Sequence, residues 1–134
     1  MKKLLIISTL ILCSCQSNQN SFKLVYPSKT IETITLLGDT LTSPDIKDGK
    51  SFNNFKSAQI NYFENENSPE ALIWYGRRVA YLGYYREAIK IFTLGIENFP
   101  NDARLYRHRG HRYISTRQYD NAISDFKKAL ELID

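Results

Sequence analysis

Residues 69–102 read PEALIWYGRRVAYLGYYREAIKIFTLGIENFPND, and residues 103–134 read ARLYRHRGHRYISTRQYDNAISDFKKALELID. The second stretch repeats the pattern of the first with an offset of 34 residues, the spacing from Gly76 to Gly110. Each copy has the apolar spacing of two amphipathic helices, and helix pairs repeated at this period are typical of a helical solenoid. The other matched pairs are Arg78 and Arg112, Tyr85 and Tyr119, Ala88 and Ala122, Ile89 and Ile123, Phe92 and Phe126, and Glu97 and Glu131.

Small residues recur at equivalent places on these predicted helices. A glycine inside a helix costs about 1 kcal/mol relative to alanine, so a cost carried twice at one position indicates a packing benefit. Small side chains let neighbouring helix backbones approach, and bulky side chains fill the space beside them. The residues predicted to pack the repeat are Gly76, Ala88, Phe92, Gly110, Ala122 and Phe126.

The spacing of Gly76, Ala88, Phe92 and Pro100, repeated by Gly110, Ala122 and Phe126, resembles the tetratricopeptide repeat (TPR) family. The chain departs from that family where Trp and then Leu are usual, because it has Leu72 and Tyr75 in the first copy and Tyr106 and Arg109 in the second. The resemblance implies an all-α fold in which antiparallel helix pairs stack as a short right-handed solenoid. It also implies a binding scaffold that performs no chemistry.

The N-terminus has the features of an export signal. Lys2 and Lys3 precede an apolar run from Leu4 to Leu12, which suits a secretory signal and is shorter than the ~20 residues that span a bilayer. Leu12-Cys13-Ser14-Cys15 resembles a bacterial lipobox, and that resemblance predicts acylation of Cys15 and a membrane-anchored envelope lipoprotein on the periplasmic or outer-membrane side. An ordinary cleaved signal without a lipid is the alternative.

Composition agrees with one small exported domain. Both cysteines lie in the signal region, which leaves the folded part without a thiol, a disulfide or a cysteine-based metal site. Loss of Lys2 and Lys3 with the signal would lower the formal net charge from +4 to +2, because 16 basic residues then face 14 acidic ones. We divide the chain into a lipoprotein signal (1–14), a tether and extended segment (15–50), a capping helix and connection (51–68), repeat 1 (69–102) and repeat 2 (103–134).

The segment before the repeats changes character twice. Residues 16–50 are polar and form the expected N-terminal tether, within which residues 30–37 have β-type composition. A single short strand is not stable alone, so we expect these residues to lie extended against the helices. Residues 52–63 then return to helical spacing, at the place of a second helix one period before Tyr85–Asn98, and we expect this helix to cap the stack.

The repeat helices have clear start signals. Ser68 and Asp102 are predicted N-caps, and Pro69 suits the first helical position, where its missing N–H is harmless. Helices are expected at about residues 69–82, 85–98, 103–116 and 119–133. At the end of the second copy no following helix covers Leu130 and Ile133, which predicts self-association through this uncapped helix or a natural chain that continues.

A cluster of basic residues occupies the first helix of the second copy. No acidic residue lies between Asp102 and Asp120, so the like charges on this helix repel one another. The TPR resemblance puts first helices on the concave groove, and arginine suits planar carboxylates. The predicted partner-binding residues are Arg77, Arg104, Arg107 and His111. The alternative is a structural role, in which these arginines pair with Glu70, Glu87, Glu97, Asp120 or Asp125.

Other functions receive less support from the residues. His108 and His111 have the spacing of a metal pair, but the surrounding arginines oppose a cation. Nucleic-acid binding conflicts with export, and no catalytic constellation or cofactor motif can be assembled. We therefore expect a lipid-anchored envelope scaffold, not an enzyme, that needs no cofactor and binds a protein or peptide with acidic groups. The alternatives are a basic surface that docks on anionic membrane or cell-wall polymer, and a capping fragment of a longer array.

Overall fold

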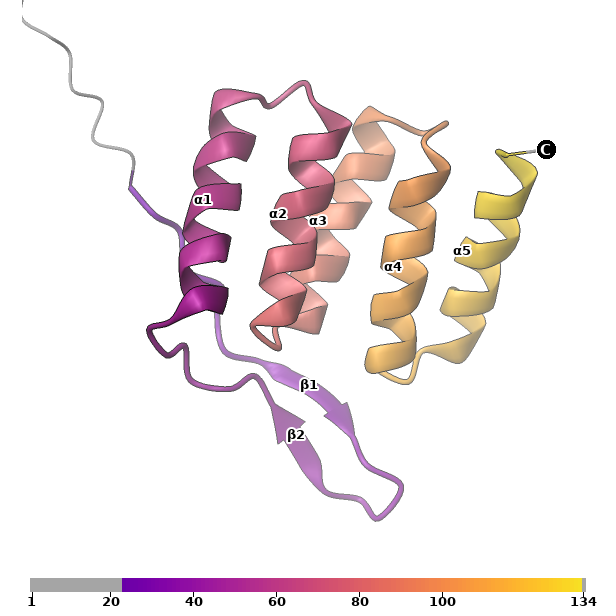
Figure 1. Ribbon diagram of the computed structural model, residues 1–134. Coiled ribbons are helices and arrows are strands. Elements are labelled where there is room, and N and C mark those ends of the chain that lie inside the picture. Colours follow the sequence, from indigo (N-terminus) through magenta and orange to yellow (C-terminus); the bar gives the residue numbers. More distant parts are fainter. Residues whose placement is uncertain (1–22, 134) are drawn as a thin grey trace, which may run out of the picture.

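The computed structural model describes residues 23–133, so the predicted signal and Cys15 lie outside the described residues. The described part has a β-hairpin followed by five helices that stand side by side as antiparallel neighbours (Figure 1). Their bounds are β1 Ile31–Ile34, β2 Thr40–Thr42, α1 Lys50–Glu64, α2 Pro69–Tyr81, α3 Tyr85–Asn98, α4 Ala103–Ser115 and α5 Tyr119–Glu131. The predicted all-α solenoid of helix pairs is confirmed.

The first helix of each repeat starts at a side-chain cap. The Ser68 hydroxyl accepts a hydrogen bond from the backbone N–H of Ala71, and Pro69 follows it at the start of α2. The Asp102 carboxylate accepts in the same way from the N–H of Arg104 at the start of α4. These bonds satisfy amides that have no partner inside the helix, which fixes both starts one period apart.

The turns between paired helices use a left-handed residue at the same place in each repeat. Gly83 has φ +87° between α2 and α3, and Arg117, one period later, has φ +61° between α4 and α5. Glycine adopts this conformation without a steric cost, whereas arginine does not. The second repeat therefore has the same turn geometry as the first without the glycine that favours it.

The core runs along the seam between the helices. Phe55, Leu72, Phe92 and Leu105 are almost completely buried and come from four different helices. Small residues allow this approach: a Cβ added at Gly95 would lie 2.6 Å from a Leu72 methyl and 2.8 Å from a Leu105 methyl. Such distances are too short for van der Waals contact, so the glycine is a packing requirement.

The residues predicted to pack the repeat meet one another in pairs. A Cβ on Gly76 would lie 2.7 Å from the Phe92 ring, and one on Gly110 would lie 2.8 Å from the Phe126 ring. Ala88 and Ala122 are buried at the corresponding places on α3 and α5. Each repeat thus sets the aromatic ring of its second helix against the glycine of its first.

Helix α1 caps the N-terminal end of the stack. It occupies the position of a second helix one period before α3, and its Phe55 ring packs on Tyr75 of α2 with ring centroids 6.2 Å apart. The fully buried Gln59 amide donates to the Tyr75 hydroxyl at 2.9 Å and also holds residue 25, because it accepts from the Val25 N–H and donates to the Val25 carbonyl. This amide ties α1, α2 and the N-terminal segment together.

The N-terminal segment corrects one expectation. Residues 31–34 do not form a lone extended stretch; they pair antiparallel with β2, and Ile31 faces Thr42, Thr33 faces Leu41 and Ile34 faces Thr40. The turn at Gly38-Asp39 brings the partner strand back, with an irregular register between Ile31 and Thr33. The prediction failed because residues 40–42 are too short and polar to carry a strand signal of their own.

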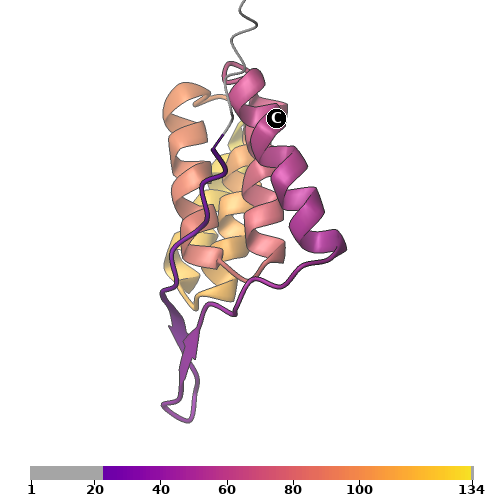
Figure 2. The ribbon, with the colours of Figure 1, turned by 90° about the vertical axis from the view of Figure 1, so that its left-hand side faces the viewer.

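The N-terminal strap, residues 23–46, does lie against the helices, as Figure 2 shows for its course along the stack. Buried Glu32 accepts from the backbone N–H of Arg86 at 2.8 Å near the start of α3, which has no cap from its own Tyr84. The Thr33 hydroxyl donates to the Thr116 carbonyl, and the Tyr84 hydroxyl donates to the Pro44 carbonyl. Within residues 23–133 no helix has the length and apolar character needed to cross a bilayer.

Candidate functional site: a basic cavity between α2 and α4

The first helices α2 and α4 enclose a cavity of about 230 Å³ whose walls are basic and aromatic. Arg77 and His111 occupy equivalent places, one period apart, on the two helices, and both line it. The sequence analysis assigned these two residues to one surface because they share a register on neighbouring first helices, and both line this cavity. The complete lining is Arg77, Tyr81, Phe92, His108, His111 and Arg112.

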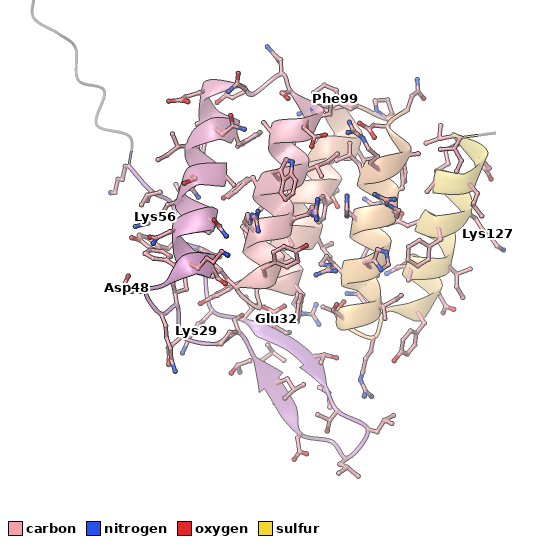
Figure 3. All side chains as sticks on the ribbon, in the orientation of Figure 1. Lys29, Glu32, Asp48, Lys56, Phe99 and Lys127 are labelled. Carbon is pink, nitrogen blue, oxygen red and sulfur yellow. The ribbon has the colours of Figure 1, made fainter. Side chains whose placement is uncertain are left out.

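Aromatic rings hold the arginines of this cavity in place. The Arg77 guanidinium lies over the Trp74 ring at 4.1 Å from its centroid and donates to the Tyr81 hydroxyl at 3.2 Å. Arg112 lies over Tyr85 at 5.7 Å. Rings attract a cation through their negative faces but leave its net charge uncompensated. Figure 3 shows that nitrogen-bearing side chains gather along the parts of α2 and α4 that are turned toward the viewer.

Neither arginine of the cavity has an ion-pair partner among the described residues. Burial lowers the pKa of Arg112, the direction expected for a cation removed from water, and the charge of Arg77 adds to this. The hydrogen bond from Arg77 lowers the pKa of the Tyr81 hydroxyl. The protein therefore holds two partly buried positive charges that an incoming anion would stabilise.

The two histidines of the cavity differ in environment. His108 stacks on Phe92 with ring centroids 5.7 Å apart, and burial, followed by the charges of Arg107 and Arg77, lowers its pKa to about 4. His111 is exposed and meets the edge of Phe126, and burial together with the charges of Arg112 and Arg107 lowers its pKa as well. Both rings are neutral at pH 7 and gain a proton only in acid or beside an anion.

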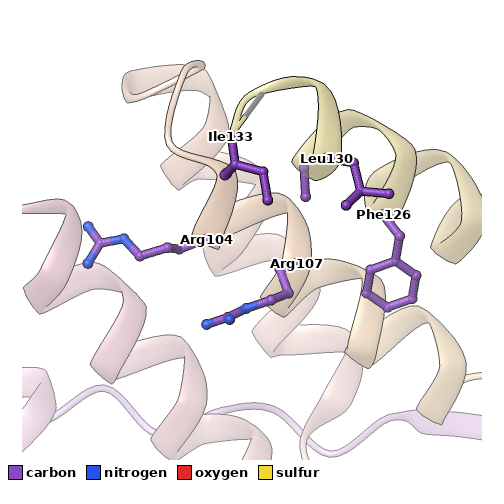
Figure 4. A pocket seen from close by; sticks show the side chains of 7 residues that line it. Arg104, Arg107, Phe126, Leu130 and Ile133 are labelled. Atoms are coloured by element: carbon purple, nitrogen blue, oxygen red, sulfur yellow. The ribbon is translucent and has the colours of Figure 1, made fainter.

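Arg104 and Arg107 take other positions from those expected. Arg104 donates to Glu70 at 2.5 Å and to Asp102 at 2.8 Å, so it links the starts of α2 and α4. Arg107 is exposed and lines a second cavity, between α4 and α5, with Phe126, Leu130 and Ile133 (Figure 4). The four predicted binding residues therefore do not line one groove: of these four, Arg77 and His111 line the cavity between α2 and α4, and Arg104 and Arg107 do not.

Arg109 and Asp125 form a structural ion pair. Arg109 Nε and Nη2 donate to the two Asp125 carboxylate oxygens at 2.8 and 2.7 Å, and Arg109 Nη1 donates to the Thr93 hydroxyl. One period earlier, Tyr75 and Ile91 stand in these places. Both positions are uncharged in the first repeat and charged in the second, and this joint difference is the sequence signal that could have revealed the pair. The structural alternative thus holds for Arg104 and Arg109.

Arg112 and Tyr81 line the cavity without having been singled out as binding residues. Arg112 repeats Arg78, so its position in the pattern was visible, but repetition by itself indicates packing as readily as binding. Tyr81 differs from its counterpart Ser115, and only the contact with Arg77 across one helical turn reveals its place in the cavity.

Known proteins resemble the helical part of this chain. A family model described as tetratricopeptide repeat matches residues 103–133. The human protein named tetratricopeptide repeat protein 13 is 33% identical over 90 residues, in an alignment that covers 62% of this chain and 10% of that protein. The structure called "Crystal structure of MamA" superposes with a TM-score of 0.56 and 26% identity, covering 61% of this chain and 48% of that chain. Residues 103–133 thus match the tetratricopeptide repeat family, and the helical part of the chain has the fold of that family.

A second solved structure agrees with the TPR fold. "MamA MSR-1 C2" gives a TM-score of 0.51 at 21% identity over 61% of this chain and 52% of that chain. The chain therefore spans about half of the MamA structures it matches and a tenth of the human relative. TPR folds are in general scaffolds for protein–protein interaction and are typically without catalytic activity.

Proposed function

We propose that this TPR domain is a lipid-anchored scaffold of the bacterial envelope that binds an acidic segment of another protein through the cavity between α2 and α4. The observation that carries the binding proposal is the pair Arg77 and Arg112, which are partly buried and have no ion pair among residues 23–133. Their guanidinium groups already lie over aromatic rings before a ligand arrives, which reduces the entropy lost on binding.

Charge and size favour a carboxylate-bearing segment for this cavity. Arginine offers a planar set of donors that matches a carboxylate with two parallel hydrogen bonds. A space of about 230 Å³ accepts an acidic side chain and leaves the rest of the segment on the surface of the first helices. Tyr81 and the two histidines add polar contacts around the charged group.

The anchor and the envelope location rest on the N-terminal sequence. Lys2, Lys3, the apolar run and the lipobox-like Leu12-Cys13-Ser14-Cys15 support export and acylation of Cys15. We expect a long-chain acyl label to enter the protein and to be lost in Cys15→Ser, while Cys13→Ser retains it. Unlabelled protein in the soluble fraction would contradict the anchor.

The binding proposal is tested with a probe of defined chemistry. A peptide library of equal length, with Glu or Asp at zero to four positions, is titrated by calorimetry against the parent chain, Arg77→Ala and Arg112→Ala. Affinity should rise with acidic content, fall with salt and drop about tenfold or more in each variant, since charge-assisted hydrogen bonds contribute about 1.5–3 kcal/mol. Lys127→Ala, which removes one positive charge from α5, is the matched control and should bind as the parent does.

Two outcomes would count against the groove. If Lys127→Ala and Arg77→Ala lowered peptide affinity equally, the effect would come from the net charge of the protein and not from the cavity. A fall of several degrees in melting temperature for both arginine variants, with unchanged peptide affinity, would assign these arginines to stability. A basic surface for anionic polymer remains the second candidate, favoured by exposed Arg107 beside His111, and it predicts binding that ignores peptide sequence.

The exposed apolar surface beside α5 supports one further partner. Leu130 and Ile133 are 59% and 69% exposed beside Phe126 and line a cavity of about 280 Å³ with almost wholly apolar walls. Self-association through α5 would cover this surface.

A further inference from the structure

The β-hairpin has an apolar tip that no helix covers. Leu36 and Leu37 are 89% and 91% exposed, the highest values among the large apolar side chains of the described residues. They lie in the turn between β1 and β2, which projects beyond the end of the helical stack (Figures 1 and 2). Two adjacent leucines at the apex of a projection are a feature that folding of the domain does not explain.

The hairpin is held in shape at its tip. The Thr35 N–H donates to the Asp39 carbonyl at 2.8 Å, and the Gly38 N–H donates to the Thr35 carbonyl at 3.1 Å. The hydroxyl of Thr35 accepts from the Asp39 N–H at 3.0 Å and donates to its carboxylate at 3.3 Å. The leucines are therefore presented by an ordered turn, so little conformational entropy remains to be lost when they are buried.

The hairpin is also fixed to the helical domain at its base. Glu32 accepts from Ser43 at 2.5 Å and from the Arg86 N–H at 2.8 Å, while the Arg86 guanidinium donates back to the Glu32 carbonyl. Thr33 bonds the C-terminal end of α4 through the Thr116 carbonyl. A force or a contact at the tip is thus transmitted to the stack, and the tip can set the orientation of the whole domain.

We propose that the hairpin tip inserts Leu36 and Leu37 into the apolar boundary of the membrane and orients the TPR domain on the lipid surface. The proposal rests on the proposed envelope location, and three observations select lipid as the occupant. The tip is a narrow projection that carries Leu36 and Leu37 at its apex, with Ile34 and Leu41 also exposed on the strands behind them, so its apolar side chains can enter a fluid surface without a preformed partner pocket. Residues 35–42 contain threonines and one acid but no lysine or arginine, so contact requires no anionic partner.

The third observation is the proximity of the predicted anchor in the chain. Seven residues lie between Cys15 and Lys23, the first described residue, and the eight steps of ~3.3–3.6 Å from one to the other reach at most about 29 Å. The strap then leads directly into β1. The predicted tether would keep the domain within this distance of the bilayer, and membrane proteins with a lipid chain commonly use a second contact.

Depth in the bilayer tests the proposal in the full chain. Leu37→Trp is made with Trp74→Phe, so that one tryptophan remains, and the purified protein is mixed with phosphatidylcholine vesicles whose acyl chains carry bromine. Tryptophan at position 37 should shift to shorter emission wavelength and be quenched about twofold or more, as expected for a side chain at the acyl boundary. Leu94→Trp in the same background, an exposed apolar position on α3, is the matched control and should stay unquenched.

A second pair of variants separates the tip from the anchor. Leu36→Asp and Leu37→Asp should each lower vesicle partitioning of unacylated Cys15→Ser chain by about tenfold or more, the transfer free energy of one leucine. Leu94→Asp should leave it unchanged. Because these residues are almost fully exposed, melting temperatures should match the parent. The mass of the natural chain reports acylation separately, so failure of the anchor and failure of the tip are distinct results.

Three results would overturn the proposal. Equal quenching at positions 37 and 94 would remove the tip as the membrane contact. Partitioning that appears only with phosphatidylglycerol would assign the contact to the basic residues of α4. Association in the absence of vesicles that Leu36→Asp abolishes would make the tip an interface between copies of the chain.

Discussion

The two ends of the helical stack are finished in different ways. On α1, the positions one period before Ala88, Ile91 and Gly95 are Asn54, Ser57 and Asn61, so the side that α3 packs against α2 is polar in α1. At the other end, Leu130 of α5 and Ile133 just beyond the helix are exposed and line an apolar cavity (Figure 4). Solenoid ends need a polar outer face to be soluble. Among residues 23–133, the polar side of α1 matches that requirement, whereas no described residue covers the apolar surface beside α5.

The strap strengthens this contrast. It adds hydrogen bonds to α1 through Gln59, to α3 through Arg86 and to the end of α4 through Thr116. Helix α5 receives no such contact from the described part of the strap. Stability should therefore be distributed unevenly, with the α1–α3 part as the firm region and α5 as the region that opens first.

The largest test compares one aromatic residue from each end. Phe55 is fully buried, and truncation in Phe55→Ala should cost about 3–5 kcal/mol of unfolding free energy, measured with urea. Phe126 is only partly buried, so Phe126→Ala should cost clearly less, because water already reaches the ring. Equal losses would show that the two ends are equally well packed.

A smaller difference is expected for two equivalent glycines. In Gly76→Ala the new methyl meets a Phe92 ring that is 1% exposed and has no room to move, so overpacking should cost about 1–3 kcal/mol. In Gly110→Ala the Phe126 ring can move toward solvent, and the gain of about 1 kcal/mol in helix propensity should offset the strain. Melting temperatures of the two variants test this, and the comparison fails if Gly110→Ala is as destabilised as Gly76→Ala.

His108, in the middle of the stack, makes the stability of the folded chain depend on pH. The pKa of His108 is about 4 in the folded chain and near 6.5 when unfolded, so the unfolded state binds the proton first as pH falls. Stability is therefore complete above pH 6.5 and declines between pH 6.5 and about 4. His108→Gln should flatten this part of the melting-temperature profile. An anion bound beside Arg77 would favour the protonated ring, so acidic peptides should bind more tightly as pH falls through this window.

The smallest effect on stability is expected at the open end. Ile133→Lys changes a side chain that is 69% exposed, and the melting temperature should move by no more than a degree or two, equivalent to about 0.5 kcal/mol. If α5 associates with another copy, the same change should abolish concentration dependence in sedimentation. A parent chain that sediments as a monomer at every concentration would remove self-association from the proposal.

Much of this architecture could be predicted because it is local. Ser68, Pro69, Asp102 and Gly83 act within one turn of their own helix, so the helix starts and one turn follow from the order of the residues. The 34-residue offset fixed which residues share a face, and for that reason Arg77 and His111 were assigned together. A repeat converts sequence distance into spatial neighbourhood, which makes this kind of contact readable.

The remainder was decided by tertiary contacts that the period does not encode. Glu32 meets Arg86 across 54 positions and Thr33 meets Thr116 across 83, so neither the latched hairpin nor its exposed tip had a local signal. Two arginines three positions apart on α4 have different roles. Arg109 forms an ion pair with Asp125 and is structural, whereas Arg112 has no ion pair among residues 23–133, lies over the Tyr85 ring and lines the cavity. The sequence by itself determined which side chains are charged and which helix face carries them. Which charges are neutralised depends on the distances between helices, and those exist only in the folded chain.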